Sequence, residues 1–96
     1  MTNCGLSICI PRIEKHVTKK YLALSFDRVG NVFKVDIVYS NNGDKKAFVH
    51  LNYCYQNKLG SLFSQMINNG EEVKFVHSKR GWFWKCSKSR SEKSIF

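Results

Sequence analysis

Residues 22–38 of this 96-residue chain read LALSFDRVGNVFKVDIV and contain the passage from a helix into a strand that decides the fold. Three apolar residues lie at i, i+4 and i+7, the spacing of one helical face: Leu22, Phe26 and Val29. Thr18 is a suitable N-cap, and Gly30 supplies a C-cap with positive φ. The stretch therefore predicts a helix from Thr18 to about Val29, with one apolar stripe that covers a sheet.

The period changes to two over residues 31–39, as in a strand with one buried face. One face is apolar, with Phe33, Val35, Ile37 and Tyr39, and the other carries Lys34, Asp36 and Val38. The NNGD sequence of residues 41–44 is a strong turn signal and predicts a hairpin. In its second strand we expect Ala47, Val49 and Leu51 to lie beneath, and Lys46, Phe48 and His50 to face outward.

The flanking residues complete a βαββαβ order. Residues 7–10 predict a half-buried strand that ends at Pro11, with Ile8 and Ile10 on one side and Cys9 on the other. A second helix is expected from its N-cap Asn57 to Asn69-Gly70, with an apolar face of Leu59, Leu62, Phe63, Met66 and Ile67. Gly60 is expected to weaken its first turn by about 1 kcal/mol relative to Ala.

Two further strands are expected over residues 72–77 and 82–86, joined by a tight turn at residues 78–81. The whole pattern predicts an α+β domain: a βαββαβ, ferredoxin-like two-layer sandwich with an extra C-terminal hairpin strand. The length allows one domain, for which we expect residues 1–87, followed by a basic flexible tail over residues 88–96.

The charge indicates a polyanionic partner. Lys and Arg number 16 against 7 Asp and Glu, which gives a formal net charge of +9. Such an excess attracts nucleic acid first and an acidic protein second. No membrane partner, secretory signal or cofactor is expected, so we expect an intracellular protein, cytoplasmic or nuclear. The four cysteines are expected to be reduced, and no metal site is expected because the cysteines and histidines lack ligand-like spacing.

The order of elements and residues 22–38 resemble the RNA recognition motif (RRM) family. Its first-strand hexamer is matched by Ile8-Cys9-Ile10-Pro11-Arg12-Ile13, and its third-strand octamer by Asp44-Lys45-Lys46-Ala47-Phe48-Val49-His50-Leu51. The stretches AFVHLNYCYQN (residues 47–57) and GWFWKCS (residues 81–87) also resemble small RRM-like proteins of large nucleocytoplasmic DNA viruses. This second resemblance implies a viral origin, with a host cell as the location.

The resemblance implies binding of single-stranded RNA on the outer face of the sheet. In the family, three outward aromatic rings stack on bases, and the matching positions here are Cys9, Lys46 and Phe48. One ring of three is therefore kept. We expect bases to stack on Phe48 and on one or both of Trp82 and Trp84. The two tryptophans are equally compatible with a place in the core. The expected nucleic-acid-binding set is Lys46, Phe48, His50, Cys9, Lys34, Lys79, Arg80, Trp82, Trp84 and Lys85.

The alternative function is a protein-interaction module, an adaptor or a homodimer, that uses the same sheet face. Phe48, Val38 and Trp82 would then be anchors, and an acidic partner would match the charge. An enzyme is not expected, because no carboxylate pair, phosphate-binding loop or nucleophile–base spacing stands out. Asp36 and His50 are expected on adjacent strands as a surface pair. The oligomeric state is left open.

Overall fold

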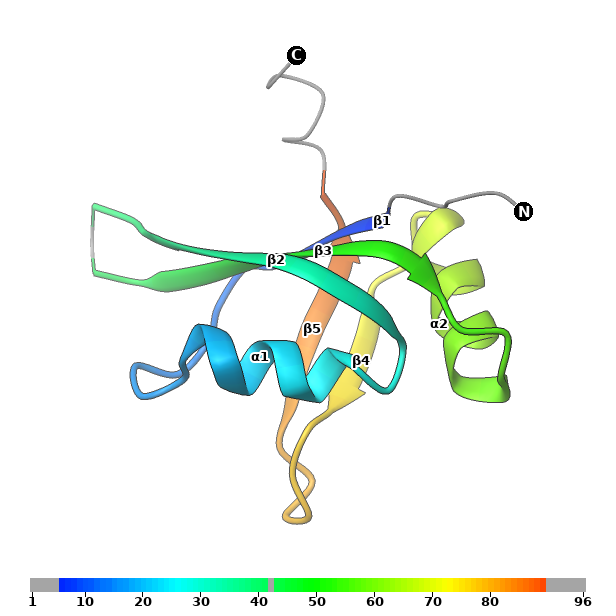
Figure 1. Cartoon of the computed structure of the whole chain (residues 1–96). Coiled ribbons are helices and arrows are strands. Elements are labelled where there is room, and N and C mark those ends of the chain that lie inside the picture. Colours follow the sequence, from blue (N-terminus) through cyan, green and yellow to red (C-terminus); the bar gives the residue numbers. More distant parts are fainter. Residues whose placement is uncertain (1–5, 42, 90–96) are drawn as a thin grey trace.

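The computed structural model describes residues 6–41 and 43–89 and has an α+β fold with two helices and one antiparallel sheet (Figure 1). Along the chain the elements are β1 (Leu6–Ile10), α1 (Lys19–Phe26), β2 (Gly30–Tyr39), β3 (Lys45–Cys54), α2 (Lys58–Asn68), β4 (Val73–Val76) and β5 (Phe83–Lys88). The five strands lie in the order β2-β3-β1-β5-β4, and every neighbouring pair is antiparallel. The last strand, β5, therefore lies beside β1, and β4 lies at the edge of the sheet.

The first helix begins as predicted and ends earlier. Thr18 is its N-cap, with the side-chain oxygen accepting a hydrogen bond from the Tyr21 backbone N–H at 3.2 Å. The helix ends at Phe26, not at Val29. The prediction of a positive-φ cap at Gly30 was wrong, because Gly30 opens β2 and lies outside the residues with positive φ. A Cβ at this position would lie 2.3 Å from the Tyr53 backbone oxygen, so close strand packing explains the glycine.

The core forms where the sheet bends around the first helix. Figure 1 shows α1 beneath β2 and β3, with the β4–β5 hairpin turning away from those strands and passing behind α1. Phe26 stacks on Phe75 of β4 at a centroid distance of 4.4 Å and on Trp84 of β5 at 6.0 Å. The predicted stripe of Leu22, Phe26 and Val29 is fully buried. Burial of these apolar groups is the main term that holds the sheet and α1 together.

The β2–β3 hairpin has the expected turn but an unexpected irregularity. Gly43 has φ +87°, and its N–H donates to the Ser40 carbonyl at 3.0 Å. The register shifts between Val32 and Lys34, so Phe33 is an extra residue on β2. Its side chain is 58% exposed, and the prediction that Phe33 shares the buried face was wrong. Tyr39 is also exposed, because β2 continues past the end of the core.

The second helix follows the prediction at both ends. The Asn57 side chain accepts from the Gly60 N–H at 2.7 Å, and Gly70 has φ +84° just beyond Asn69. Phe63 and Ile67 are buried, whereas Leu59 and Leu62 are exposed. Gly60 is buried where the helix start meets the chain before it, and a Cβ there would lie 2.3 Å from the Tyr55 carbonyl oxygen. Gly60 therefore permits a close approach, which the propensity scale alone does not show.

The chain remains in the sheet slightly beyond the predicted boundary. β5 extends to Lys88, and the Ser89 N–H donates to the Ser7 carbonyl at 2.9 Å. The rest of the predicted basic tail, residues 90–96, lies outside the described residues. Within residues 6–41 and 43–89, neither helix has the length and apolar character needed to span a bilayer.

Candidate functional site

On β1, β2 and β3, the sheet surface opposite the core cluster carries half of the predicted site residues, and we call this part of the surface the open face. It comprises Ser7 and Cys9 of β1, Phe33, Lys34, Asp36 and Val38 of β2, and Lys46, Phe48 and His50 of β3. These residues alternate with buried ones that pack against the helices, such as Ile8, Val35 and Val49. The sequence pattern therefore placed Cys9, Lys34, Lys46, Phe48 and His50 together, as the structure does.

Phe48 lies at the centre of the open face. Its β3 position pairs with Cys9 of β1 on one side and with Asp36 of β2 on the other. The ring is half-buried between these neighbours, less exposed than the alternation suggested. Burial raises the pKa of the Cys9 thiol, and the Lys46 ammonium partly offsets that rise. The environment is thus mainly apolar, with a cation close by.

His50 is held by hydrogen bonds on both ring nitrogens. Nε2 lies 3.0 Å from Asp36 Oδ2, and Nδ1 lies 2.9 Å from Ser7 Oγ. A neutral ring satisfies both contacts when Nε2–H donates to the carboxylate and Nδ1 accepts from the Ser7 hydroxyl. Because both nitrogens are engaged within the chain, His50 offers a ligand its ring surface, not a hydrogen bond.

Ser7, His50 and Asp36 stand in the hydrogen-bond order of a hydroxyl, an imidazole and a carboxylate, which sequence reasoning missed. Ser7 and His50 are 43 residues apart, and only the β1–β3 register brings them together. A nucleophilic hydroxyl must reach a substrate carbonyl, but Ser7 is only 6% exposed. In this arrangement the three groups orient His50 across three strands.

Phe33 is the aromatic residue that sequence reasoning left out of the site. The extra residue in β2 turns its ring toward His50, with a centroid distance of 6.0 Å. Phe33 therefore adds a second phenylalanine to the open face, with more exposed surface than Phe48. Strict alternation assigns Phe33 to the core, and no signal in the sequence marks the bulge.

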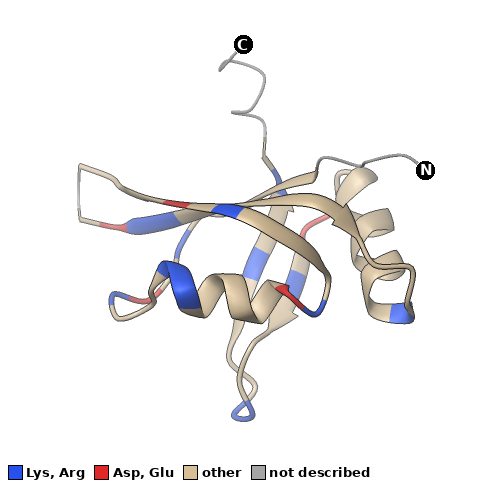
Figure 2. Cartoon of the chain, in the orientation of Figure 1, with Lys and Arg blue, Asp and Glu red and all other residues tan. Residues whose placement is uncertain are grey.

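The charges on the open face are mixed. Lys34 Nζ lies 3.9 Å from Asp36 Oδ1, so part of its charge is balanced by a neighbour. Lys45, next to Lys46 in sequence, points the other way and is buried, with Nζ donating to the Lys15 and Val17 carbonyls at 2.8 and 2.6 Å. Lys45 is thus a structural residue, and Lys46 is the cation of this pair that lies on the open face. Figure 2 shows basic residues over several elements, not in one block.

Trp84 belongs to the core, one of the two positions that the sequence allowed. It is 2% exposed, and its Nε1–H donates to Glu14 Oε1 at 3.0 Å. Burial alone would raise the pKa of Glu14. The hydrogen bond from Trp84, a backbone hydrogen bond and the nearby His77 and His16 outweigh burial, and the pKa of Glu14 is lowered. With both faces of its ring packed, Trp84 offers no stacking surface to a base.

Lys79, Arg80 and Trp82 lie apart from the open face. Figure 1 shows the β4–β5 hairpin extending to the opposite end of the molecule from β2 and β3, and its tip is basic in Figure 2. Trp82 precedes β5 and is 54% exposed. The three residues line one cavity at the turn end of this hairpin. The residues of the expected nucleic-acid-binding set therefore lie in two separate places, with Phe48 on the open face and Lys79, Arg80 and Trp82 at the hairpin turn.

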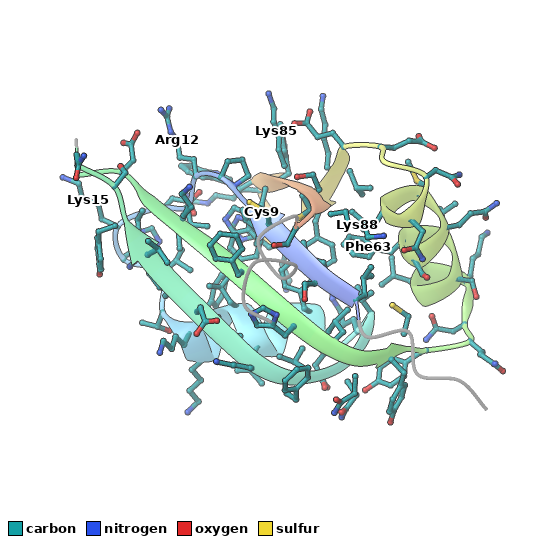
Figure 3. All side chains as sticks on the ribbon, turned by 90° about the horizontal axis from the view of Figure 1, so that it is seen from above. Cys9, Arg12, Lys15, Phe63, Lys85 and Lys88 are labelled. Carbon is teal, nitrogen blue, oxygen red and sulfur yellow. The ribbon has the colours of Figure 1, made fainter. Side chains whose placement is uncertain are left out.

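Lys85 lies on β5 on the same side of the sheet as Cys9, because Ser87 pairs with Cys9 and Lys85 is two residues before Ser87. It lines a cleft with Arg12 and Phe83, and Figure 3 shows Arg12 and Lys85 projecting from the same rim of the sheet. Lys85 pairs with Lys74 across the β4–β5 ladder. The cleft thus places cations near the β1 end of the open face, where Cys9 lies.

Compared with models of known protein families and with curated proteins, the chain matches none. Its function is therefore argued from its own surfaces. The open face combines two phenylalanine rings, an oriented imidazole and two lysines, a set that suits stacking and anion contact.

Proposed function

We propose that this chain is a non-catalytic module that binds single-stranded nucleic acid, with RNA as the natural class, on the open face of a degenerate RRM-like sheet. The strand order β2-β3-β1-β5, with α1 after β1 and α2 after β3, supports a ferredoxin-like arrangement to which β4 is added at the edge. In such an arrangement both crossover helices cover one side of the sheet, which leaves the other side for a ligand.

One observation carries the proposal: Phe33 and Phe48 share the open face with Lys34 and Lys46. Aromatic rings stack on any base, and neighbouring lysines contact the phosphates that link the bases. His50 lies between the rings, 6.0 Å from Phe33, and its fixed orientation makes it a part of this stacking surface. The bulge at Phe33 thus restores a ring to a face on which Cys9 and Lys46 stand at expected aromatic positions.

The proposed module is non-catalytic because the Ser7 hydroxyl is buried. Ser7 is the nucleophile candidate nearest to a base on the open face, and it is 6% exposed. Its hydrogen bond instead completes the support of His50. Binding without turnover is therefore the function that this geometry favours.

The test is a fluorescence anisotropy titration of labelled single-stranded RNA and DNA of one sequence at several salt concentrations. Phe33→Ala and Phe48→Ala should each weaken binding by about 1–3 kcal/mol, the contribution of one stacked base. Leu24→Ala is the matched control, because Leu24 is 63% exposed on α1 and away from the open face. Equal loss in this control, or unchanged affinity in both phenylalanine variants, would remove the open face from the binding site.

Salt dependence tests the lysines separately. For a single strand, the slope of log K against log salt is about −0.7 per phosphate contact. Lys34→Ala combined with Lys46→Ala should therefore reduce the slope by about 1.4 if each lysine contacts one phosphate. Lys58→Ala at the start of α2 serves as the control. A slope that the double variant leaves intact would place the phosphates elsewhere.

A second candidate function is self-association through β2, one of the two edge strands of the described sheet. Val38 and Tyr39 are exposed on this strand, beside the open backbone edge. Light scattering distinguishes the two functions, because a dimer doubles the mass and survives moderate salt. Val38→Lys should abolish such a dimer and leave the stacking contribution of Phe48 unchanged.

A further inference from the structure

A cavity of about 440 Å³ lies at the turn end of the β4–β5 hairpin, lined by residues of the turn and away from the open face. It is formed by two regions that are distant in sequence: residues 14–21, which lead into α1, and the turn of the hairpin. Its walls include Glu14, His16, Tyr21, Lys79, Arg80 and Trp82. The volume is within the range of small-molecule sites, which is about 300–1,000 Å³.

The walls of this cavity are aromatic and held in place from behind. Trp82 and Tyr21 are 54% and 39% exposed, so both present ring surface. His77 stacks on the buried Trp84 at a centroid distance of 3.8 Å, and Tyr21 Oη lies 2.9 Å from His77 Nδ1. The rings behind the cavity are thus fixed by the core, while Trp82 is free to stack on a ligand ring.

The polar groups of the cavity carry both signs of charge. Lys79 and Arg80 occupy the exposed turn that Gly81 closes with φ +87°. Glu14 contributes a carboxylate, one oxygen of which accepts from Trp84. His77 Nε2 is buried and has no hydrogen-bond partner among the described residues, so folding alone leaves one polar atom of this wall unsatisfied.

We infer that this cavity binds one phosphorylated nucleotide whose base carries an amino group, with the base on Trp82, the phosphate at Lys79 and Arg80, and the amino group facing Glu14. Such a ligand combines a planar ring, an anion and a hydrogen-bond donor. These groups match the aromatic, the cationic and the carboxylate side chains of the cavity, respectively. The choice of a nucleotide as the ligand class rests on the proposed function, although the residues of the cavity are not those of the open face. A free mononucleotide and the phosphorylated end of a strand share this chemistry.

The experiment is a titration of the full chain with CMP, UMP, cytidine and inorganic phosphate, followed by Trp fluorescence and calorimetry. CMP should bind, while cytidine should bind about tenfold more weakly because it lacks the charged contact. UMP, which has a carbonyl where CMP has the amino group, should also bind at least about fivefold more weakly. Equal binding of UMP and CMP would overturn the role of Glu14, and equal binding of phosphate and CMP would overturn the nucleotide assignment.

Variants locate the site. Trp82→Ala, and Lys79→Ala with Arg80→Ala, should each weaken CMP about tenfold. The matched control is Lys19→Ala with Lys20→Ala, two adjacent exposed lysines at the start of α1. Glu14→Gln should remove the preference for CMP over UMP while circular dichroism shows a folded chain. CMP affinity that is unchanged in both cavity variants would overturn the inference.

Oligonucleotides with and without a 5′-phosphate separate the two sources of the ligand. If the chain prefers the phosphorylated strand and Trp82→Ala abolishes this preference, the ligand of the cavity is a strand end. If the cavity binds CMP and shows no such preference, its ligand is a free nucleotide. Phe48→Ala separates the two proposals: oligonucleotide binding that needs Phe48, together with CMP binding that does not need Trp82, overturns the cavity and supports the open face. If CMP binding needs Trp82 and oligonucleotide binding is unchanged in Phe48→Ala and Phe33→Ala, the cavity is supported and the open face is excluded as the binding site.

Discussion

Phe33 lies 6.0 Å from His50, centroid to centroid, because β2 contains one residue more than β3 at this point. The bulge has two consequences. Val32 packs against the core in the place that alternation assigns to Phe33, and Phe33 joins the open face. A local change in strand pairing thus determines how many rings the proposed binding surface has.

This pairing predicts a contrast between two neighbouring residues of β2. Phe33→Ala should leave the free energy of unfolding within about 0.5 kcal/mol of the parent, because the ring is 58% exposed. Val35→Ala should lower it by about 1–3 kcal/mol, because Val35 is buried in the core. Urea denaturation of the two variants measures the difference. A large loss for Phe33→Ala would mean that the strand is regular and the ring is in the core.

The pH dependence of stability should come in part from His77. Burial lowers the pKa of His77 below its ordinary value of 6.5; the nearby Glu14 carboxylate opposes this shift and His16 adds to it. The unfolded chain therefore takes up this proton first as the pH falls. The stabilisation is present in full above about pH 6.5 and is lost as the pH falls through the pKa of the folded state.

Glu14 acts in the same direction at lower pH. Its pKa is lowered from 4.5, so its stabilisation is present above that pH and is lost as the pH falls further. Urea denaturation between pH 7.5 and 5.5 should show a fall in stability that His77→Gln reduces. Glu14→Gln should change the profile mainly below pH 4.5. A His77→Gln variant with the full slope between pH 6.5 and 5.5 would show that another group titrates.

Cysteine alkylation provides a footprint of the open face. Cys86 is buried, and burial, followed by the nearby Cys9 and Glu72, raises the pKa of its thiol to about 12, so it should not react at pH 8.5. Cys9 is half-buried on the open face and should react slowly, and more slowly still in Lys46→Ala, which removes the cation that lowers its pKa. Peptide mass spectrometry follows both rates.

Bound nucleic acid should protect Cys9. A saturating single-stranded oligonucleotide should slow alkylation of Cys9 and leave Cys54 unchanged, because Cys54 packs against the core at the far end of β3. Cys9 that reacts at the same rate with and without the oligonucleotide would place the strand away from the open face.

Local chemistry made part of this structure predictable. The N-caps Thr18 and Asn57 and the turn at Gly43 were predicted correctly, because each depends on residues within a few positions of one another. The positions of Cys9, Lys46 and Phe48 on the open face were predicted correctly, because side chains alternate regularly between the two faces along these strands. Pairing across the sheet was not predictable in this way, since Ser7 meets His50 only through the β1–β3 register.

The two tryptophans show the same limit at the hairpin. Trp82 and Trp84 have the spacing of one strand face, yet they are 54% and 2% exposed. The difference arises because β5 begins at Phe83, and because the rings that cover Trp84 come from α1 and β4. No pattern within residues 81–87 contains that information. Separating the cavity from the open face likewise required the bend of the sheet.

At Gly60, helix propensity and tertiary packing favour different residues. Replacing a helical glycine by alanine is favourable by about 1 kcal/mol on propensity alone. A Cβ at Gly60, however, would lie 2.3 Å from the Tyr55 carbonyl oxygen and 2.8 Å from that of Val29, closer than real Cβ contacts. Both oxygens belong to the backbone, so relief of either clash requires a backbone shift. A shift of Val29 would also strain the hydrogen bond that its carbonyl accepts from the Tyr55 N–H at 2.8 Å.

Overpacking at such a site costs about 1–3 kcal/mol and more where backbone must move, which exceeds the gain in propensity. Gly60→Ala should therefore lower the free energy of unfolding, as measured by urea denaturation. Ser61→Ala, at the next and exposed position of α2, should raise it by a few tenths of a kcal/mol at most. A Gly60→Ala variant more stable than the parent would mean that α2 starts farther from Val29 and Tyr55 than this fold requires.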